Sequence, residues 1–206
     1  NLKIKIIEIS SNKQSNNLEV YLMGRVNLGS TTINYPMPVV LIGSKTNKGK
    51  SDFLTVSWIT MVSENPYKVL ISLYKKHTIS AEIKENKAFS MCVPSKEQVK
   101  NVDYCGVVGM ENLNKADFFH IFYGTLDGTP MIEECKLNAE CKVEKIIDCG
   151  SHELFIGEIL QVHVDDSVTS DKKVCLEKMQ PMILDTDNKK YREVGNIVDD
   201  AFKKYK

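Results

Sequence analysis

The chain has 206 residues, 42% hydrophobic and 26% charged, which predicts one folded domain and argues against intrinsic disorder. Basic and acidic residues number 27 each, so the basic excess typical of nucleic-acid-binding proteins is missing. The only arginines are Arg25 and Arg192, so a phosphate site would have to rely on lysines, hydroxyls or backbone N–H groups.

Targeting signals and cysteines indicate where the protein works. No run of about 20 apolar residues occurs in the sequence, so we expect no membrane span. Residues 1–10 alternate Lys and Ile without the apolar core or cleavage site of a secretion signal, and we interpret them as a strand. The six cysteines form no C-x-x-C pair, which predicts reduced thiols in the cytoplasm rather than disulfides or a metal site.

Most of the chain has the pattern of β-strands. Two apolar runs around a polar turn predict a β extension at residues 1–34. Pro36 and Pro38 exclude a central strand at their own positions, and a short, fully apolar strand follows at once. The β-branched and aromatic composition predicts further strands, with a turn at residues 64–66. These expected strands cover residues 39–43, 53–60, 69–74, 89–93, 137–143 and 154–164.

The two late strands carry additional signals. Residues 137–143 alternate apolar and polar side chains, which predicts a strand buried on one face only. Gly157 in the last strand indicates a bulge or a close approach of another chain segment.

Helices are few and short. Residues 78–86 have Ile79 and Ile83 four apart and Thr78 as the expected N-cap. Residues 95–98 have the capping-box form S-x-x-Q and open a short helix whose Val99 and Val102 point inward. Residues 112–119 and the apolar face at residues 197–205 predict two more helices. Many short strands with few helices predict a closed antiparallel barrel with peripheral helices.

Several polar segments are candidates for chemistry, and each also has an ordinary structural interpretation. In residues 55–58, Thr55 and Ser57 would face one side of a strand, with Val56 and Trp58 on the other. From spacing alone we favour a barrel strand with Trp58 in the core.

Residues 74–78 follow a strand and open a helix, where free N–H groups favour an anion. Spacing alone favours a solvated loop there. A lone histidine such as His152 is more often structural than catalytic, although histidine can hold or transfer a proton near neutral pH. By default Lys115 is a surface lysine, and His120 and His163 are structural. No G-x-G-x-x-G follows a strand, so a dinucleotide-binding α/β fold has no support.

Taken in order, these segments resemble the flavin reductase-like family of split β-barrels. The resemblance covers about residues 35–204, and its most specific piece is residues 150–158, GSHELFIGE. The other matching segments are residues 35–43 (YPMPVVLIG), 53–58 (FLTVSW), 65–66 (NP), 77–78 (HT), 89–95 (FSMCVPS), 104–106 (YCG) with Lys115, 140–143 (ECKV) and 191–195 (YREVG).

The resemblance implies a mainly β, Greek-key type split barrel, usually dimeric, with FMN rather than FAD near the subunit interface. It implies one domain over residues 1–206. It also implies that electrons pass from NADH, NADPH or a protein redox partner through the flavin to an acceptor. His152 would lie near the flavin or nicotinamide. The implied cofactor-binding residues are Thr55, Val56, Ser57, Trp58, Ser72, Leu73, Lys76, His77, Thr78 and Lys115.

Some positions depart from the family pattern. Asp52 stands where relatives often have Asn, and a carboxylate there would disfavour a nearby phosphate unless it faces away. Cys92 stands in place of Asn, and Asn114 in place of the Asp before Lys115. Gly109 and Met110 replace Ser-Gly, which removes a hydroxyl donor. These departures favour a flavoredoxin-like electron carrier over a reductase of diffusible flavin.

Two other functions stay open on the sequence. The chain could bind FMN, or another planar cofactor, as an electron carrier or binding module that nicotinamide does not reduce. It could also be a cofactor-free barrel acting in protein interactions. The family of pyridoxamine-phosphate oxidases shares the barrel, but its arginine-richer phosphate site does not fit a chain with two arginines.

Overall fold

The computed structural model describes residues 26–33, 35–109 and 115–202, in two compact units, residues 1–33 and 34–206. In the first unit, residues 26–33 form neither helix nor strand, and the rest of the expected β extension lies outside the described residues. Everything below concerns the second unit. None of the described helices is long and apolar enough to cross a membrane.

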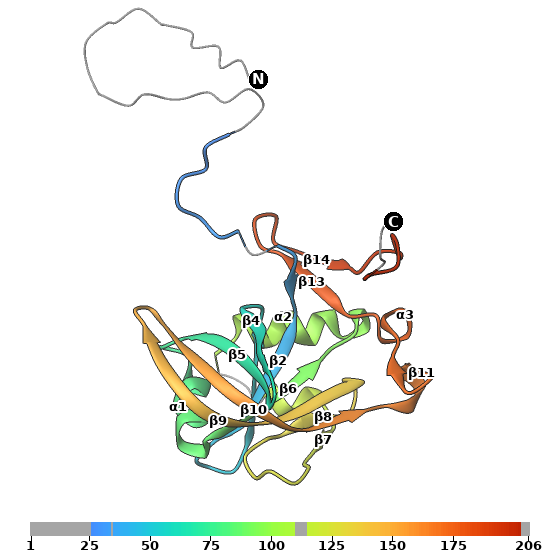
Figure 1. The fold of residues 1–206 in the computed structure, drawn as a ribbon. Coiled ribbons are helices and arrows are strands. Elements are labelled where there is room, and N and C mark those ends of the chain that lie inside the picture. The colour runs from blue at the N-terminus through green and yellow to red at the C-terminus, as the bar shows by residue number, and fades with distance from the viewer. Residues whose placement is uncertain (1–25, 34, 110–114, 203–206) are drawn as a thin grey trace, which may run out of the picture. The chain divides into compact units, whose positions relative to one another are not determined.

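The second unit is built mostly of strands (Figure 1). They are β1 (Met37–Pro38), β2 (Val40–Lys45), β3 (Ser51–Val56), β4 (Ile59–Glu64), β5 (Tyr67–Tyr74), β6 (Ala88–Val93), β7 (Ile121–Phe122), β8 (Met131–Ile132), β9 (Leu137–Cys149), β10 (His152–Val164), β11 (Thr169–Ser170), β12 (Lys173–Val174), β13 (Met182–Asp185) and β14 (Lys190–Glu193). The α-helices are α1 (Thr78–Asn86), α2 (Val99–Val107) and α3 (Leu176–Met179), and the 3-10 turns are η1 (Lys96–Gln98), η2 (Lys115–Phe118) and η3 (Asp166–Val168).

The main sheet has the strand order β3-β2-β6-β9-β10-β5-β4, and all its pairings are antiparallel. The two edge strands, β3 and β4, therefore run in the same direction, and only Ser57 and Trp58 separate them. The Cα atoms of Val56 and Ile59 can be at most about 11 Å apart, because consecutive Cα atoms are about 3.8 Å apart. The sheet must therefore curl until its edges meet, as in a barrel.

The expected strand over residues 53–60 is thus two strands in one extended stretch. Its first half pairs with β2 and its second half pairs with β5. A strand that changes partners at a bend is a common way to make a barrel corner. The predicted mainly β fold with few peripheral helices is confirmed.

Two apolar clusters lie on the two faces of β2, which explains its uninterrupted apolar sequence. Val40 and Ile42 belong to the first cluster, together with Phe89, Phe155 and Ile79 and Ile83 of α1. Leu41 belongs to the second, under α2, whose Val102 is buried there. The capping box at Ser95 and Gln98 is present as predicted.

β9 and β10 form a long hairpin, with α1 on the side of its tip and α3 near its other end (Figure 1). The predicted one-sided burial of β9 is wrong, because Asn138 and Glu140 are buried as well. The segment that leads to β9 covers this face. Asn138 hydrogen-bonds the backbone of Ile132 and Cys135. Glu140 accepts from the N–H of Leu126 and pairs with His163 Nε2 at 2.8 Å.

Two other helix predictions differ from the structure. Residues 194–202 form no helix, and Ile197, Val198 and Phe202 are 78%, 99% and 103% exposed. Their apolar face contacts no core, and a short isolated helix is marginal in water. In the expected helix over residues 112–119, residues 112–114 lie outside the described residues and Lys115–Phe118 form a 3-10 turn.

The packing of the barrel can be tested by a substitution at Gly157. This glycine lies at a register shift between β9 and β10, and a Cβ there would be 2.7 Å from the buried ring of Phe89. We expect Gly157→Ala to lower the free energy of unfolding by about 1–3 kcal/mol, because the core would be overpacked. Urea denaturation measures the change. The control is Gly195→Ala, which meets no atom within 4 Å and should stay within about 0.5 kcal/mol. Equal stability of the two variants would contradict the packing.

Candidate functional site

A pocket of about 190 Å³ lies where β3, α1, α2 and η2 come together. Four residues singled out in the sequence, Lys76, His77, Thr78 and Lys115, line it, although they are up to 39 positions apart. Its other lining residues are Asp52, Leu54, Ile79, Gly106, Val107, Val108 and Gly109. The structure thus brings the expected phosphate-binding segment and the distant lysine to one place.

The N-terminus of α1 opens into this pocket. The N-cap residue is His77 rather than the predicted Thr78, which is the first helical residue. No described side chain caps the helix, and its first turn carries no acidic residue. Backbone N–H groups and the positive end of the helix dipole therefore remain for an anion, next to Lys76.

Lys115 and Asp52 form a buried ion pair in the pocket wall. Their side chains are 4% and 1% exposed, and Lys115 Nζ lies 3.4 Å from Asp52 Oδ1. Lys115 also donates to the carbonyl of Phe53 at 2.9 Å, and Asp52 accepts from the N–H of Phe53 at 2.8 Å. An ammonium has three donors, so one is left for the pocket. The lysine is therefore part of the wall, and not the surface lysine that its sequence position suggests by default.

Burial and neighbouring charges shift the pKa values of Asp52 and His77 in the pocket wall. Burial raises the pKa of Asp52, while Lys115 and the Phe53 N–H act in the opposite direction. Burial also lowers the pKa of His77, and electrostatic interactions with Lys115 and His152 add to this. His77 is therefore neutral at pH 7 and offers the pocket a hydrogen bond rather than a charge.

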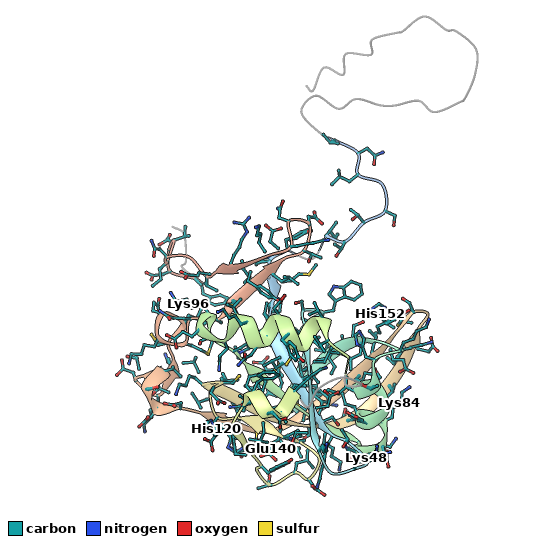
Figure 2. All side chains as sticks on the ribbon, turned by 180° about the vertical axis from the view of Figure 1, so that it is seen from behind. Lys48, Lys84, Lys96, His120, Glu140 and His152 are labelled. Atoms are coloured by element: carbon teal, nitrogen blue, oxygen red, sulfur yellow. The ribbon has the colours of Figure 1, made fainter. Side chains whose placement is uncertain are left out.

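A group of aromatic side chains adjoins the pocket through His77. Tyr74 contacts His77 with ring centroids 5.8 Å apart and His152 at 5.6 Å. His152 stacks on Trp58, with centroids 4.9 Å apart and an interplanar angle of 28°. Tyr74 and His152 face each other across β5 and β10, and Trp58 comes from the junction between β3 and β4. Figure 2 shows His152 near the tip of the β9–β10 hairpin.

The placement of Trp58 overturns the interpretation that spacing alone favoured. Val56 is in the core, but Trp58 is 45% exposed. The regular alternation of a strand ends at Val56, because the chain changes pairing partner there. The indole is thereby turned to His152, whose Nδ1 lies 2.9 Å from Ser151 Oγ.

The remaining predicted residues are placed less favourably for contact with a ligand. Thr55 Oγ1 donates to the carbonyl of Val102, so α2 uses this hydroxyl. Val56 and Leu73 have buried side chains in the first apolar cluster. Ser57 and Ser72 are partly buried, and the N–H of Ser72 donates to the Trp58 carbonyl at 2.9 Å.

Sequence reasoning missed some residues of the site. Tyr74 belonged to the candidate segment 74–78 but was not among the predicted site residues, yet it links His77 to His152. Gly106 and Gly109 entered the sequence analysis only through the family resemblance and were not predicted site residues, yet they line the pocket. Gly106 also packs against Thr55, where a Cβ would approach to 3.3 Å. Gly106 lies inside α2, and a glycine in a helix is a signal for the close approach of another segment.

A family model described as "Flavin reductase like domain" matches residues 32–194. The chain belongs to the flavin reductase-like family. This confirms the resemblance seen in the sequence and assigns the closed sheet to the split-barrel fold of the family.

Solved structures agree with this assignment. A flavoredoxin from Methanosarcina acetivorans is 33% identical with a TM-score of 0.84, and the match covers 87% of this chain and 96% of that one. The flavoredoxin of Desulfovibrio vulgaris (Miyazaki F) is 28% identical with a TM-score of 0.81, covering 86% and 97%. An NADH-dependent FAD reductase from Streptomyces globisporus is 25% identical over 142 residues, which are 66% of this chain and 74% of the reductase.

The buried ion pair of this flavin reductase-like chain can be tested by removing its cation. Lys115→Met leaves Asp52 buried without a partner, which should cost about 3 kcal/mol of stability at pH 7. The loss should shrink as the pH falls, because the variant raises the native pKa of Asp52 further and protonation removes the buried charge. Thermal unfolding between pH 5 and 8 measures this. Lys115→Met combined with Asp52→Asn should recover stability at pH 7, and no recovery would contradict the pairing.

Proposed function

We propose that this protein is an FMN-binding oxidoreductase. It would take electrons from a nicotinamide or a reduced protein and pass them through the flavin to an acceptor. The observation that carries the proposal is the juxtaposition of the pocket at α1 with the aromatic group of Trp58, Tyr74 and His152. FMN has a phosphate at one end and an aromatic ring system at the other. The pocket would bind the phosphate, and the adjoining aromatic group would contact the ring system.

The pocket fits a phosphate group. Positive charge comes from Lys76 and from the remaining donor of Lys115. The uncapped N-terminus of α1 adds backbone N–H donors. Its volume of about 190 Å³ is below the range of about 300–1,000 Å³ of pockets that enclose whole ligands. The phosphate and the adjoining chain would therefore enter it, while the ring stays outside. Asp52 adds negative charge, which favours the single phosphate of FMN over the two of FAD.

The aromatic group would receive and orient the flavin ring. Trp58 and Tyr74 offer exposed ring surface, and His152 can donate a hydrogen bond or hold a proton. When bound, the flavin supplies the electron-transfer chemistry, and the protein orients it and adjusts its electrostatics. His152 would be the catalytic residue because its ring lies between Trp58 and Tyr74 and beside the pocket at His77.

Exposed apolar side chains on β4 and β10 support a homodimer. β4 is an edge strand whose Met61 and Val62 are exposed, and Leu160 and Val162 of β10 are exposed as well. An apolar edge strand left in water tends to associate. We propose that this surface, and β4 above all, lies between two copies of the chain. We also propose that the protein works in the cytoplasm.

An anaerobic absorbance experiment tests the function. The purified protein with added FMN should show a protein-bound flavin spectrum, and NADH or NADPH should bleach it. A bound flavin that neither nucleotide bleaches would identify the alternative, an electron carrier reduced by another protein. Absence of flavin binding even with excess FMN would refute the proposal.

The same experiment tests His152. His152→Ala should slow bleaching by about tenfold or more, as expected for a residue that positions or holds a proton. The matched control is His120→Ala, whose ring is exposed, pairs with Glu134 and lies far from His152 in Figure 2. Equal rates in the two variants would remove the catalytic role of His152.

The dimer is tested by placing a charge on β4. Met61→Lys should convert a particle of twice the chain mass into one of the chain mass, because a buried lysine at the interface is costly. Size-exclusion chromatography with light scattering measures this. Val174→Lys on β12 is the control at another exposed apolar residue. A monomeric parent protein, or a Met61→Lys variant that remains dimeric, would refute this interface.

A further inference from the structure

Glu82 is a half-buried carboxyl whose role the preceding sections leave unassigned. It lies on α1, four residues after Thr78, and residues four apart share a helix face. Its Oε2 is buried and has no hydrogen-bond partner among the described residues. A buried carboxylate oxygen without a donor is costly, so such a group needs either a partner or a proton.

The charges that act on Glu82 belong to the pocket. Asp52 of β3 and Lys115 of η2 both line the pocket, and Glu85 lies on α1 itself. α1 also packs on β2 and β6. On β2 the charged side chain is Lys45, which pairs with Asp127, and β6 carries no Asp, Glu, Lys, Arg or His. The buried ammonium of Lys115 therefore pairs with Asp52 and also acts electrostatically on Glu82.

Of these two carboxyls, Glu82 is the one suited to change its protonation. Asp52 forms an ion pair with Lys115 and accepts a hydrogen bond from the N–H of Phe53. Both interactions stabilise its charged form. Glu82 has neither for its Oε2. Burial, followed by the negative charge of Asp52, raises the pKa of Glu82 to about 7. At neutral pH the group is therefore divided between its two forms.

We propose that Glu82 sets the affinity of the pocket for the phosphate of the flavin by taking up a proton when that phosphate binds. This rests on the proposed function. The phosphate brings negative charge to the wall that Asp52 and Lys115 form, and the carboxylate of Glu82 would repel it through the same wall. A proton from solvent moves to Glu82, and the wall then carries one negative charge less. Glu82 is a positioning residue, since it acts through Lys115 and Asp52.

The sign of the pH dependence follows. Below pH 7 Glu82 is already protonated and phosphate binds at full affinity. As the pH rises through 7, binding requires uptake of a proton that becomes scarcer, so the affinity falls. The pKa of His77, which also lines the pocket, is lowered below its usual value, and His77 is the same in the parent protein and in a variant of Glu82, so comparison of the two isolates the contribution of Glu82.

The experiment is titration of the full chain with FMN, followed by flavin fluorescence, at several pH values from 6.5 to 8.5. The dissociation constant of the parent protein for FMN should rise by about tenfold over this range. This is the effect expected when phosphate binding raises the pKa of one carboxyl group by about one unit. Glu82→Gln should flatten this dependence and bind more tightly than the parent protein at pH 8.5. Titration of the phosphate itself affects both proteins equally. Glu97→Gln, at an exposed glutamate of η1 whose charge does not act on Glu82, is the matched control and should keep the pH dependence of the parent protein.

Calorimetry gives a direct measure that needs no variant. Near pH 7.5, FMN binding to the parent protein in buffers of different ionisation enthalpy should show uptake of a fraction of a proton. Riboflavin, which lacks the phosphate, should show none. Equal pH dependence in the parent protein and Glu82→Gln, or no proton uptake with FMN, would overturn the inference while leaving FMN binding intact. Absence of FMN binding at every pH would overturn the proposed function itself.

Discussion

Ser57 and Trp58 are the residues at which one extended stretch stops pairing with β2 and begins to pair with β5. Because β3 and β4 run in the same direction on the two edges of the sheet, this short junction forces the sheet to close. Closure places Trp58 outside the core and beside His152, at the start of β10. The barrel and the aromatic half of the candidate site therefore depend on the same bend.

The other half of the site depends on how buried charge is compensated. Lys115 neutralises Asp52 and also binds the carbonyl of Phe53 on the edge strand β3. The ion pair thereby fixes η2 against β3 and closes one wall of the pocket. A buried pair of this kind is costly to assemble, and it contributes little net stability compared with apolar packing. Its benefit is a cation held close to the place where a phosphate would bind.

Local patterns were sufficient where a residue's surroundings lie close in sequence or repeat along an element. The apolar run of β2, the turn before Pro66, the capping box at Ser95 and the close packing of Gly157 were predicted in this way. Patterns failed where an irregular segment folds over a face of a strand or where no described segment covers an apolar face. The segment before β9 buries Asn138 and Glu140, and the apolar face at residues 197–202 has nothing described to pack on.

The order of motifs along the sequence by itself determined the family, the mainly β class and the residues Lys76, His77, Thr78, Lys115 and His152 as site candidates. It could not show that Lys115 is buried against Asp52, that Tyr74 links His77 to His152, or that an oxygen of Glu82 has no partner in the described part of the chain. These features arise between elements that are far apart in the chain. Burial and electrostatic environment depend on which segments meet in space, and only the tertiary structure decides that.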